Sequence, residues 1–161
     1  MTNETINVVI AGLGGQGVIK ASDIIADAAF RAGLDVKKSE IHGMSQRGGS
    51  VSSDVRFGER VLSPMVPPGE ADFLVLLATD QVEPNRHQLR PGGVLITPDL
   101  IDESKLANRK ALNVAILGVL SRRLPMIPES VWLDSLKAGL PQKIHDVNLQ
   151  AFALGRATTT K

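Results

Sequence analysis

The 161-residue sequence predicts an α/β protein with a doubly wound, mostly parallel sheet flanked by helices, in a single domain over residues 1–161. Two nearly continuous apolar runs, residues 6–11 and 72–78, are typical of strands buried on both faces. A glycine-rich turn and then a stretch of helical periodicity follow the first run. Strands that alternate with helical segments in this way favour a parallel sheet.

The first expected strand, residues 6–11, is rich in β-branched residues. The following helix is expected over residues 18–31, where apolar residues recur at helical spacing, and Gly33 is placed to terminate it. Residues 34–41 are then expected to be extended. A turn-rich stretch separates them from an alternating strand at residues 50–57.

Prolines divide the rest of the chain. Pro64, Pro67 and Pro68 precede the buried strand at residues 72–78. A polar helix is expected over residues 80–90, and the Pro-Gly-Gly sequence that follows it introduces a strand at residues 94–97. The last third of the chain is expected to be helical, with helices over residues 112–124, 130–138 and 144–154.

Composition excludes several functional classes. The formal charge of +1 gives no field that would favour nucleic acid or an anionic membrane as a partner. With no cysteine, the chain holds no disulfide and no thiolate-bound zinc or iron–sulfur cluster of its own. The polar start of the chain and the absence of an apolar stretch long enough to span a bilayer indicate a cytoplasmic protein.

The glycine-rich turn is the first candidate site. Gly12, Gly14 and Gly17 match the G-x-G-x-x-G pattern between a strand and a helix, and Gly15 and Gln16 complete the loop. The amides that such a turn presents at a helix N-terminus bind anions.

Two alternatives remain open for this turn. A nicotinamide site would also need an acidic residue at the end of the second strand, and Asp35 and Glu40 are both imperfectly placed for that role. In the other alternative, the glycines only let the first helix pack closely on the sheet, and no ligand touches them.

The loop around residues 40–50 is the second candidate site, at the carboxyl end of an expected strand. It contains five residues suited to binding an anion, namely Ser45, Gln46, Arg47, Gly48 and Gly49. The guanidinium could bind a phosphate or carboxylate in a bidentate manner, and the glycines would permit close approach. The alternative for Arg47 is a salt bridge that pins the loop. His42 is interpreted as structural or interfacial, because no catalytic partner surrounds it.

Two sequence strings carry a family resemblance. GLGGQGV at residues 12–18 and SEIHGMSQRGGSVSSDVRFG at residues 39–58 resemble the gamma domain of 2-oxoacid:ferredoxin oxidoreductases, most closely the beta subunit of the indolepyruvate enzymes. DFLVLLA at residues 72–78, PGGVLI at residues 91–96 and NLQAFALGR at residues 148–156 also match, so the resemblance covers nearly the whole chain. One departure is the stretch between Pro98 and Asn113, which is shorter than expected for the family.

The resemblance implies a reaction as well as a fold. In this family a 2-oxoacid is oxidatively decarboxylated on thiamine diphosphate, coenzyme A accepts the acyl group, and electrons pass through iron–sulfur clusters to ferredoxin. The resemblance therefore implies that thiamine diphosphate, magnesium and the clusters belong to a larger partner subunit in a hetero-oligomer. The isolated chain is then expected to be inactive. Its glycine turn and Arg47 are candidate contacts to the phosphates of coenzyme A.

Two rival functions remain. A stand-alone NAD-dependent Rossmann dehydrogenase would need a nicotinamide pocket and a catalytic acid or base within this one domain. A non-catalytic assembly module would use the same loops as an interface, and exposed apolar patches around Met44, Met65 and Val66 would indicate it.

Overall fold

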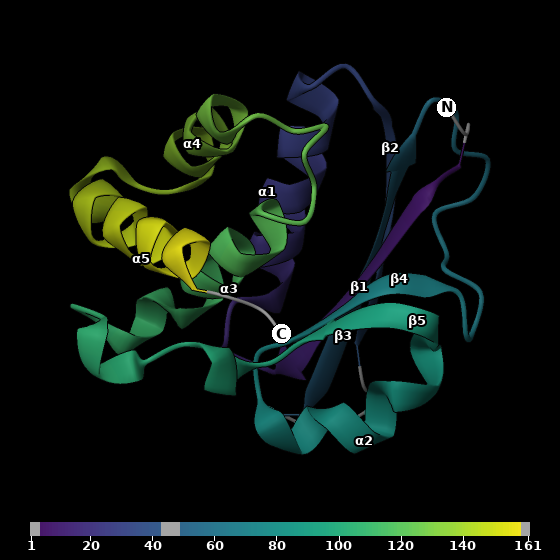
Figure 1. Cartoon of the computed structure of the whole chain (residues 1–161), viewed down its shortest axis with the longest axis horizontal. Coiled ribbons are helices and arrows are strands. Elements are labelled where there is room, and N and C mark those ends of the chain that lie inside the picture. The colour runs from purple at the N-terminus through teal and green to yellow at the C-terminus, as the bar shows by residue number, and fades with distance from the viewer. Residues whose placement is uncertain (1–3, 43–48, 159–161) are drawn as a thin grey trace.

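The computed structural model describes residues 4–42 and 49–158, which form one five-stranded sheet with helices around it (Figure 1). The strand order is β2-β3-β1-β4-β5. The strands are β1 (Ile6–Leu13), β2 (Asp35–His42), β3 (Ser50–Gly58), β4 (Ala71–Leu76) and β5 (Leu89–Ile96). The strands β1, β2, β4 and β5 run in one direction, and only β3 is antiparallel to its neighbours. The α/β fold with a mostly parallel sheet is therefore confirmed.

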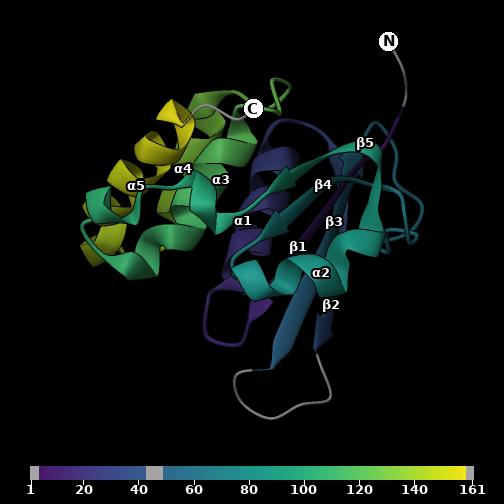
Figure 2. The same cartoon turned by 60° about the horizontal axis from the view of Figure 1, so that its bottom comes forward.

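The helices are distributed unequally over the two faces of the sheet. Four of them lie on one side of the sheet (Figure 1), namely α1 (Val18–Arg31), α3 (Leu112–Ser121), α4 (Glu129–Gly139) and α5 (His145–Ala157). Helices α1 and α3 contact the sheet, and α4 and α5 pack against α1 and α3. The other face carries the one-turn helix α2 (Val82–Asn85) (Figure 2), whose Val82 packs against a smaller apolar cluster that includes Val9 and Ala11 of β1. Among the described residues no helix is both long and apolar enough to cross a bilayer.

The main core begins between the sheet and helices α1 and α3 and continues among the four helices. Trp132 of α4 and Phe152 of α5 are fully buried there, with ring centroids 6.1 Å apart. Helices α3 and α5 approach each other through Gly118 and Gly155. A Cβ on Gly155 would overlap the carbonyl oxygen of Ala115, so only glycine permits this approach. The close contact sets the position of α3, whose first residues face the turn after β1.

The segment between β4 and β5 differs from the expectation. The prediction of one helix over residues 80–90 is wrong. The chain instead forms the 3₁₀ turn η1 (Thr79–Gln81), the short helix α2 and the 3₁₀ turn η2 (Arg86–Gln88). Pro84 has no N–H to donate in a longer helix. The last strand also begins earlier than expected, at Leu89, because a register shift opposite β4 lets it pass through the Pro-Gly-Gly sequence.

A compact connection joins β5 to α3 without a regular helix or strand. It consists of three 3₁₀ turns, η3 (Pro98–Leu100), η4 (Glu103–Lys105) and η5 (Arg109–Ala111). The side chain of Asp102 accepts a hydrogen bond from Ser104 N at 3.1 Å, and that of Asn108 accepts one from Lys110 N at 2.9 Å. These local caps stabilise the turns and bring η5 to the start of α3.

Candidate functional site

The glycine turn has the conformation that its sequence predicts. Gly12 lies in the last part of β1, where a Cβ would come within 2.8 Å of Gln16 Oε1 and 3.1 Å of Leu77 Cβ. Gly15 and Gly17 have positive φ angles of 89° and 82°, and Gly17 is the N-cap residue of α1. Because side chains disfavour such φ values, glycine is required at both positions. The turn therefore leaves the first N–H groups of α1 without side-chain caps.

Gln16 stabilises the glycine turn through hydrogen bonds with Leu13. Its Oε1 accepts a hydrogen bond from Leu13 N at 2.7 Å, and its own N–H donates to Leu13 O at 3.1 Å. This arrangement assigns the oxygen of the side-chain amide to the loop. The Nε2 group has no acceptor among the described residues, so Gln16 can still donate a hydrogen bond to a ligand.

The two sequence motifs meet at one edge of the sheet. Gly14 N donates a hydrogen bond of 2.8 Å to Gly49 O, and Leu13 at the end of β1 pairs with Ser50 at the start of β3. The remaining candidates of the second motif, Ser45, Gln46, Arg47 and Gly48, lie outside the described residues, and their roles stay predictions. The carboxyl ends of β1, β2 and β4 lie at this same edge, where α/β proteins bind ligands.

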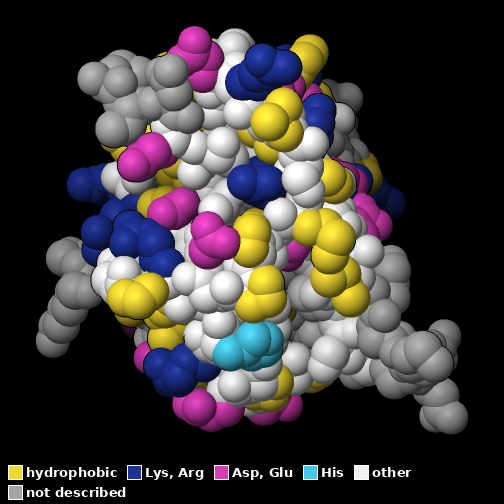
Figure 3. All heavy atoms as spheres, turned by 90° about the vertical axis from the view of Figure 1, so that its right-hand side faces the viewer, with side chains coloured by type: hydrophobic (Ala, Val, Ile, Leu, Met, Phe, Trp, Pro, Cys, Tyr) yellow, Lys and Arg dark blue, Asp and Glu magenta, His cyan; other side chains and the backbone are white. Residues whose placement is uncertain are grey.

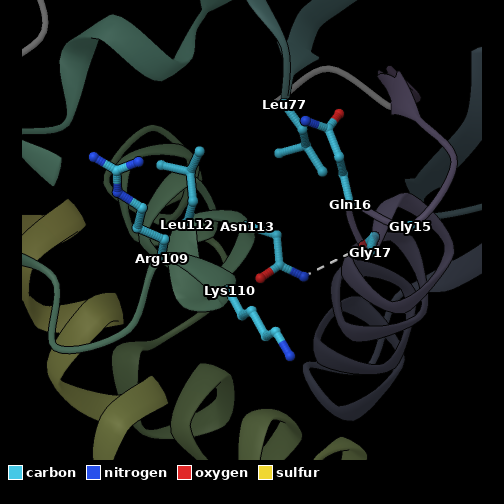
Figure 4. A pocket seen from close by; sticks show the side chains of 8 residues that line it. All are labelled: Gly15, Gln16, Gly17, Leu77, Arg109, Lys110, Leu112 and Asn113. Atoms are coloured by element: carbon cyan, nitrogen blue, oxygen red, sulfur yellow. Dashed lines mark hydrogen bonds between the residues drawn. The ribbon is translucent and has the colours of Figure 1, made fainter. Parts of the chain in front are cut away.

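A cavity of about 470 Å³ opens beside the glycine turn (Figure 4). One side is formed by Gly15, Gln16 and Gly17, which we call the glycine wall. The opposite side, here the basic wall, is formed by residues of η5 and the start of α3, namely Arg109, Lys110, Leu112 and Asn113. Leu77, which follows β4, lies between the two walls. The cavity therefore joins segments that are far apart in the sequence.

The basic wall supplies positive charge. Lys110 reaches from η5 toward α1, whereas Arg109 lies on the far side of the cavity from the glycine turn (Figure 4). Both side chains are exposed, and within the described part of the chain neither forms an ion pair or a side-chain hydrogen bond. Two available cations opposite the N-terminus of an α-helix form a site for an anion such as a phosphate group.

Asn113 connects the two walls. Its Nδ2 donates a long hydrogen bond of 3.4 Å to Gly17 O, and its Oδ1 accepts one of 2.9 Å from Val114 N. A Cβ on Gly17 would lie only 2.5 Å from Asn113 Nδ2. Gly17 is thus required for the turn and also for the close approach of α3. The sequence patterns did not identify Arg109, Lys110 or Asn113 as site residues, because their contact with the turn is entirely tertiary.

A dinucleotide site of the Rossmann type lacks its acidic residue among the described residues. Strand β3 separates β2 from β1, so the end of β2 is not adjacent to the glycine turn. Asp35 lies at the opposite end of β2 and accepts a hydrogen bond from Val61 N at 2.8 Å. Glu40 forms an ion pair with Lys38. Neither carboxylate lines the cavity, and the geometry therefore disfavours the NAD-dependent alternative.

The described residues also lack a metal site, since no group of three or more histidine or acidic side chains is placed to hold an ion. His145 is accounted for structurally, because its Nε2 lies 2.7 Å from the carbonyl oxygen of Leu140. The sequence also contains no cysteine. The best candidate site is therefore the cavity between the glycine wall and the basic wall, which we call the anion cavity.

Comparisons with known proteins identify relatives of nearly the whole chain. The family model described as pyruvate ferredoxin/flavodoxin oxidoreductase matches residues 7–104. The indolepyruvate oxidoreductase subunit IorB of Thermococcus kodakarensis is 36% identical over 191 aligned positions, which cover 92% of this chain and 93% of that protein. The alignment is longer than this chain, so the relative contains residues with no counterpart here.

Two solved structures show the same fold. The gamma subunit of the keto/oxoacid ferredoxin oxidoreductase from Geobacter sulfurreducens has a TM-score of 0.81 at 22% identity, with 94% of each chain covered. The 2-oxoglutarate:ferredoxin oxidoreductase from Magnetococcus marinus has a TM-score of 0.82 at 21% identity, and this chain covers 32% of it. The family match, the IorB relative and the shared fold lead to one conclusion: this chain belongs to the pyruvate ferredoxin/flavodoxin oxidoreductase family.

Proposed function

We propose that this chain is the accessory subunit of an indolepyruvate-type 2-oxoacid:ferredoxin oxidoreductase in the cytoplasm. The similarity to IorB, which extends over nearly the full length of both proteins, supports this role. In the proposed complex a larger subunit holds thiamine diphosphate, magnesium and the iron–sulfur clusters. The present chain has no cysteine, and its described residues offer no metal site, so it is suited to binding and orienting a substrate.

The substrate proposed for the cavity is coenzyme A, bound through its phosphate groups. The observation that carries this proposal is a pair of cations, Arg109 and Lys110, which lie opposite the N-terminus of α1 and have no ion-pair partner among the described residues. Helix N–H groups and charged side chains together bind phosphate strongly. The related structure from Magnetococcus marinus is described with coenzyme A and succinyl-CoA bound, which supports the choice of this ligand.

The residues of the cavity have separate roles in this proposal. The first turn of α1 and Gln16 Nε2 donate hydrogen bonds to phosphate oxygens, and Lys110 neutralises their charge. When coenzyme A is bound through its phosphate groups, the arm that carries its thiol remains free to reach the partner subunit. There the partner's thiamine diphosphate would supply the decarboxylation chemistry, with coenzyme A as acyl acceptor and ferredoxin as electron acceptor.

A role in assembly is compatible with this function. On the connection between β3 and β4, Leu62 is 79% exposed and Met65 is 53% exposed. This connection lies on the side of the molecule that Figure 3 shows, where apolar side chains are interspersed among charged ones. Val66, in contrast, is buried in the smaller apolar cluster, and Met44 lies outside the described residues. Leu62 and Met65 are therefore two apolar contacts that this face could offer to a partner subunit.

The test uses the complex reconstituted from this chain and its large subunit. We expect Lys110→Ala to raise the KM for coenzyme A about tenfold, which corresponds to the loss of one charge-assisted contact. Lys105→Ala is the matched control, because Lys105 is an exposed cation of the same connection that does not line the cavity. An unchanged KM in Lys110→Ala would remove the cavity from coenzyme A binding.

The same assay tests the subunit role. Indolepyruvate, pyruvate and 2-oxoglutarate are offered in turn, with reduction of an acceptor dye as the readout. We expect activity only in the mixture of both subunits, with indolepyruvate as the preferred substrate. NAD reduction by the isolated chain would overturn the proposed function.

A further inference from the structure

Strand β2 forms an open edge of the sheet. It pairs with β3 along its full length and has no second neighbour among the described residues. The other edge strand, β5, contains Pro91 and Gly92 and shifts its register against β4, and such features protect an edge from further pairing. The eight residues of β2 include no proline or glycine and show no register shift. Strand β2 is therefore regular enough to pair with a further strand.

The backbone groups of β2 that point outward follow from one hydrogen bond. Ser39 O accepts a hydrogen bond of 3.3 Å from Ser53 Oγ of β3, so the backbone groups of Ser39 point toward β3. Neighbouring residues of a strand direct their N–H and C=O groups to opposite sides. Those of Lys38 and Glu40 therefore point away from the sheet, where a second strand can bind them.

Exposed apolar side chains flank this edge on both faces of the sheet. On the helix side, Lys38 Nζ forms an ion pair of 2.8 Å with Asp23 Oδ1, which draws the lysine toward α1 and places this side of α1 over β2. Ala26 and Phe30 follow Asp23 by three and seven residues, so they lie on the same side of α1, and Phe30 is 71% exposed. On the other face of the strand, Ile41 is 46% exposed. A partner that pairs with β2 would cover both.

We propose that β2 pairs with β2 of a second copy of this chain, so that the two sheets continue across a two-fold axis. An axis perpendicular to the sheet keeps each side chain on its own face, and one residue of β2 then faces its own copy. With Ser39 at the axis, Lys38 lies opposite Glu40 of the second copy, and Lys37 lies opposite Ile41. Opposite charges directly across a strand pair stabilise it, whereas centring the pair on Lys37, Lys38 or Glu40 would place identical charges opposite each other. Charge complementarity therefore favours a second copy as the partner, and it selects one register.

This interface is separate from the anion cavity. Strand β3 lies between β2 and the strand that carries the glycine turn, and no residue of β2 lines the cavity. The inference therefore does not rest on the proposed function. In a complex with a large subunit, the paired small chains would join two such assemblies.

The experiment exploits the absence of cysteine from the sequence. In the purified full chain, Ser39→Cys introduces a single thiol that faces its own copy across the axis. The Cα atoms of such a pair lie about 4.5 Å apart, within the range of a disulfide, so mild oxidation should link most of the chain into dimers. Lys37→Cys is the matched control on the same face of β2. Its thiol lies four residues, about 13 Å, from the same thiol of the second copy and should link at least tenfold less.

Analytical ultracentrifugation tests the same interface without oxidation. We expect the parent chain to sediment as a dimer. Ile41→Lys places a charge opposite Lys37 of the second copy and should raise the Kd of the dimer at least tenfold. Met126→Lys is the control, because Met126 is an exposed apolar residue in the connection between α3 and α4. Thermal melts establish that each variant is folded.

Three results would overturn the inference. The first is a parent chain that sediments as a monomer, and the second is equal cross-linking of the two cysteine variants. The third is protection of the thiol in Ser39→Cys by the large subunit of the reconstituted complex without a link between two small chains, which would assign the edge of β2 to the large subunit.

Discussion

The two walls of the anion cavity are built by different physical rules. The glycine wall is a continuous turn between β1 and α1, and its conformation follows from Gly15 and Gly17 at positive φ. The basic wall has no local motif, and its place beside the turn depends on how α3 packs against α5. A local motif thus specifies one wall of the cavity, whereas packing between distant segments supplies the positive charge of the other wall.

The largest expected effect comes from breaking the packing that places the basic wall. In Gly155→Ala the new Cβ overlaps the carbonyl oxygen of Ala115, so α5 must move away from α3. We expect the free energy of unfolding to fall by about 3 kcal/mol, at the upper end of overpacking effects. Urea denaturation measures it. Gly139→Ala is the control, because its Cβ would meet only the side chain of Ile24, at 3.3 Å. Equal midpoints for the two variants would contradict the account.

A smaller effect tests whether the walls are coupled through Asn113. Gly17→Ala and Gly33→Ala both place a Cβ at positive φ, which costs about 1–2 kcal/mol of stability. Nothing lies within 4 Å of a Cβ on Gly33, whereas Asn113 Nδ2 lies 2.5 Å from one on Gly17. We therefore expect Gly17→Ala to be the more destabilising of the two in chemical denaturation.

The double variant completes this cycle. Adding Asn113→Ala to Gly17→Ala removes the clash, so the double variant should be less destabilised than the sum of the Gly17→Ala and Asn113→Ala single variants. If the two effects simply add, the basic wall does not press on Gly17.

The smallest expected effect concerns the pH dependence of stability and involves Asp54 of β3, which lines neither wall of the cavity. Burial raises the pKa of Asp54, and the hydrogen bond from Val66 N–H at 2.9 Å offsets this only in part. The folded protein therefore keeps this proton to a higher pH than the unfolded chain, so this group's contribution to stability falls as pH rises from 3.8 through the raised pKa.

Asp54→Asn keeps an oxygen for Val66 N–H but does not titrate. Unfolding measured across the acidic range should show a weaker loss of stability with rising pH in the variant than in the parent protein. The KM for coenzyme A should not change, because Asp54 does not line the anion cavity. A changed KM would show that Asp54 affects coenzyme A binding at a distance from the anion cavity.

Much of the fold could be predicted from local patterns. The strand at residues 6–11, the helix at residues 18–31 and the three C-terminal helices are confirmed with small shifts at their ends. Hydrophobic periodicity and glycine placement act within one turn or strand, which explains these successes. The direction of β3 was not predicted, because pairing partners are not encoded in a local period. The interruption of the helix expected over residues 80–90 was missed although Pro84, which has no N–H to donate, is a local signal for it.

The candidate site likewise has one part that local sequence predicts and another part that depends on tertiary packing. The glycine turn follows from local sequence, since positive φ and close approach at Gly12, Gly15 and Gly17 require residues without a Cβ. The sequence also determined that the chain has no thiolate for a cluster. Lys110 and Asn113, in contrast, face this turn as a result of tertiary packing, because Gly118 and Gly155 let α3 and α5 pack closely enough to bring them there. Such contacts join residues far apart in the chain, and no local pattern records them.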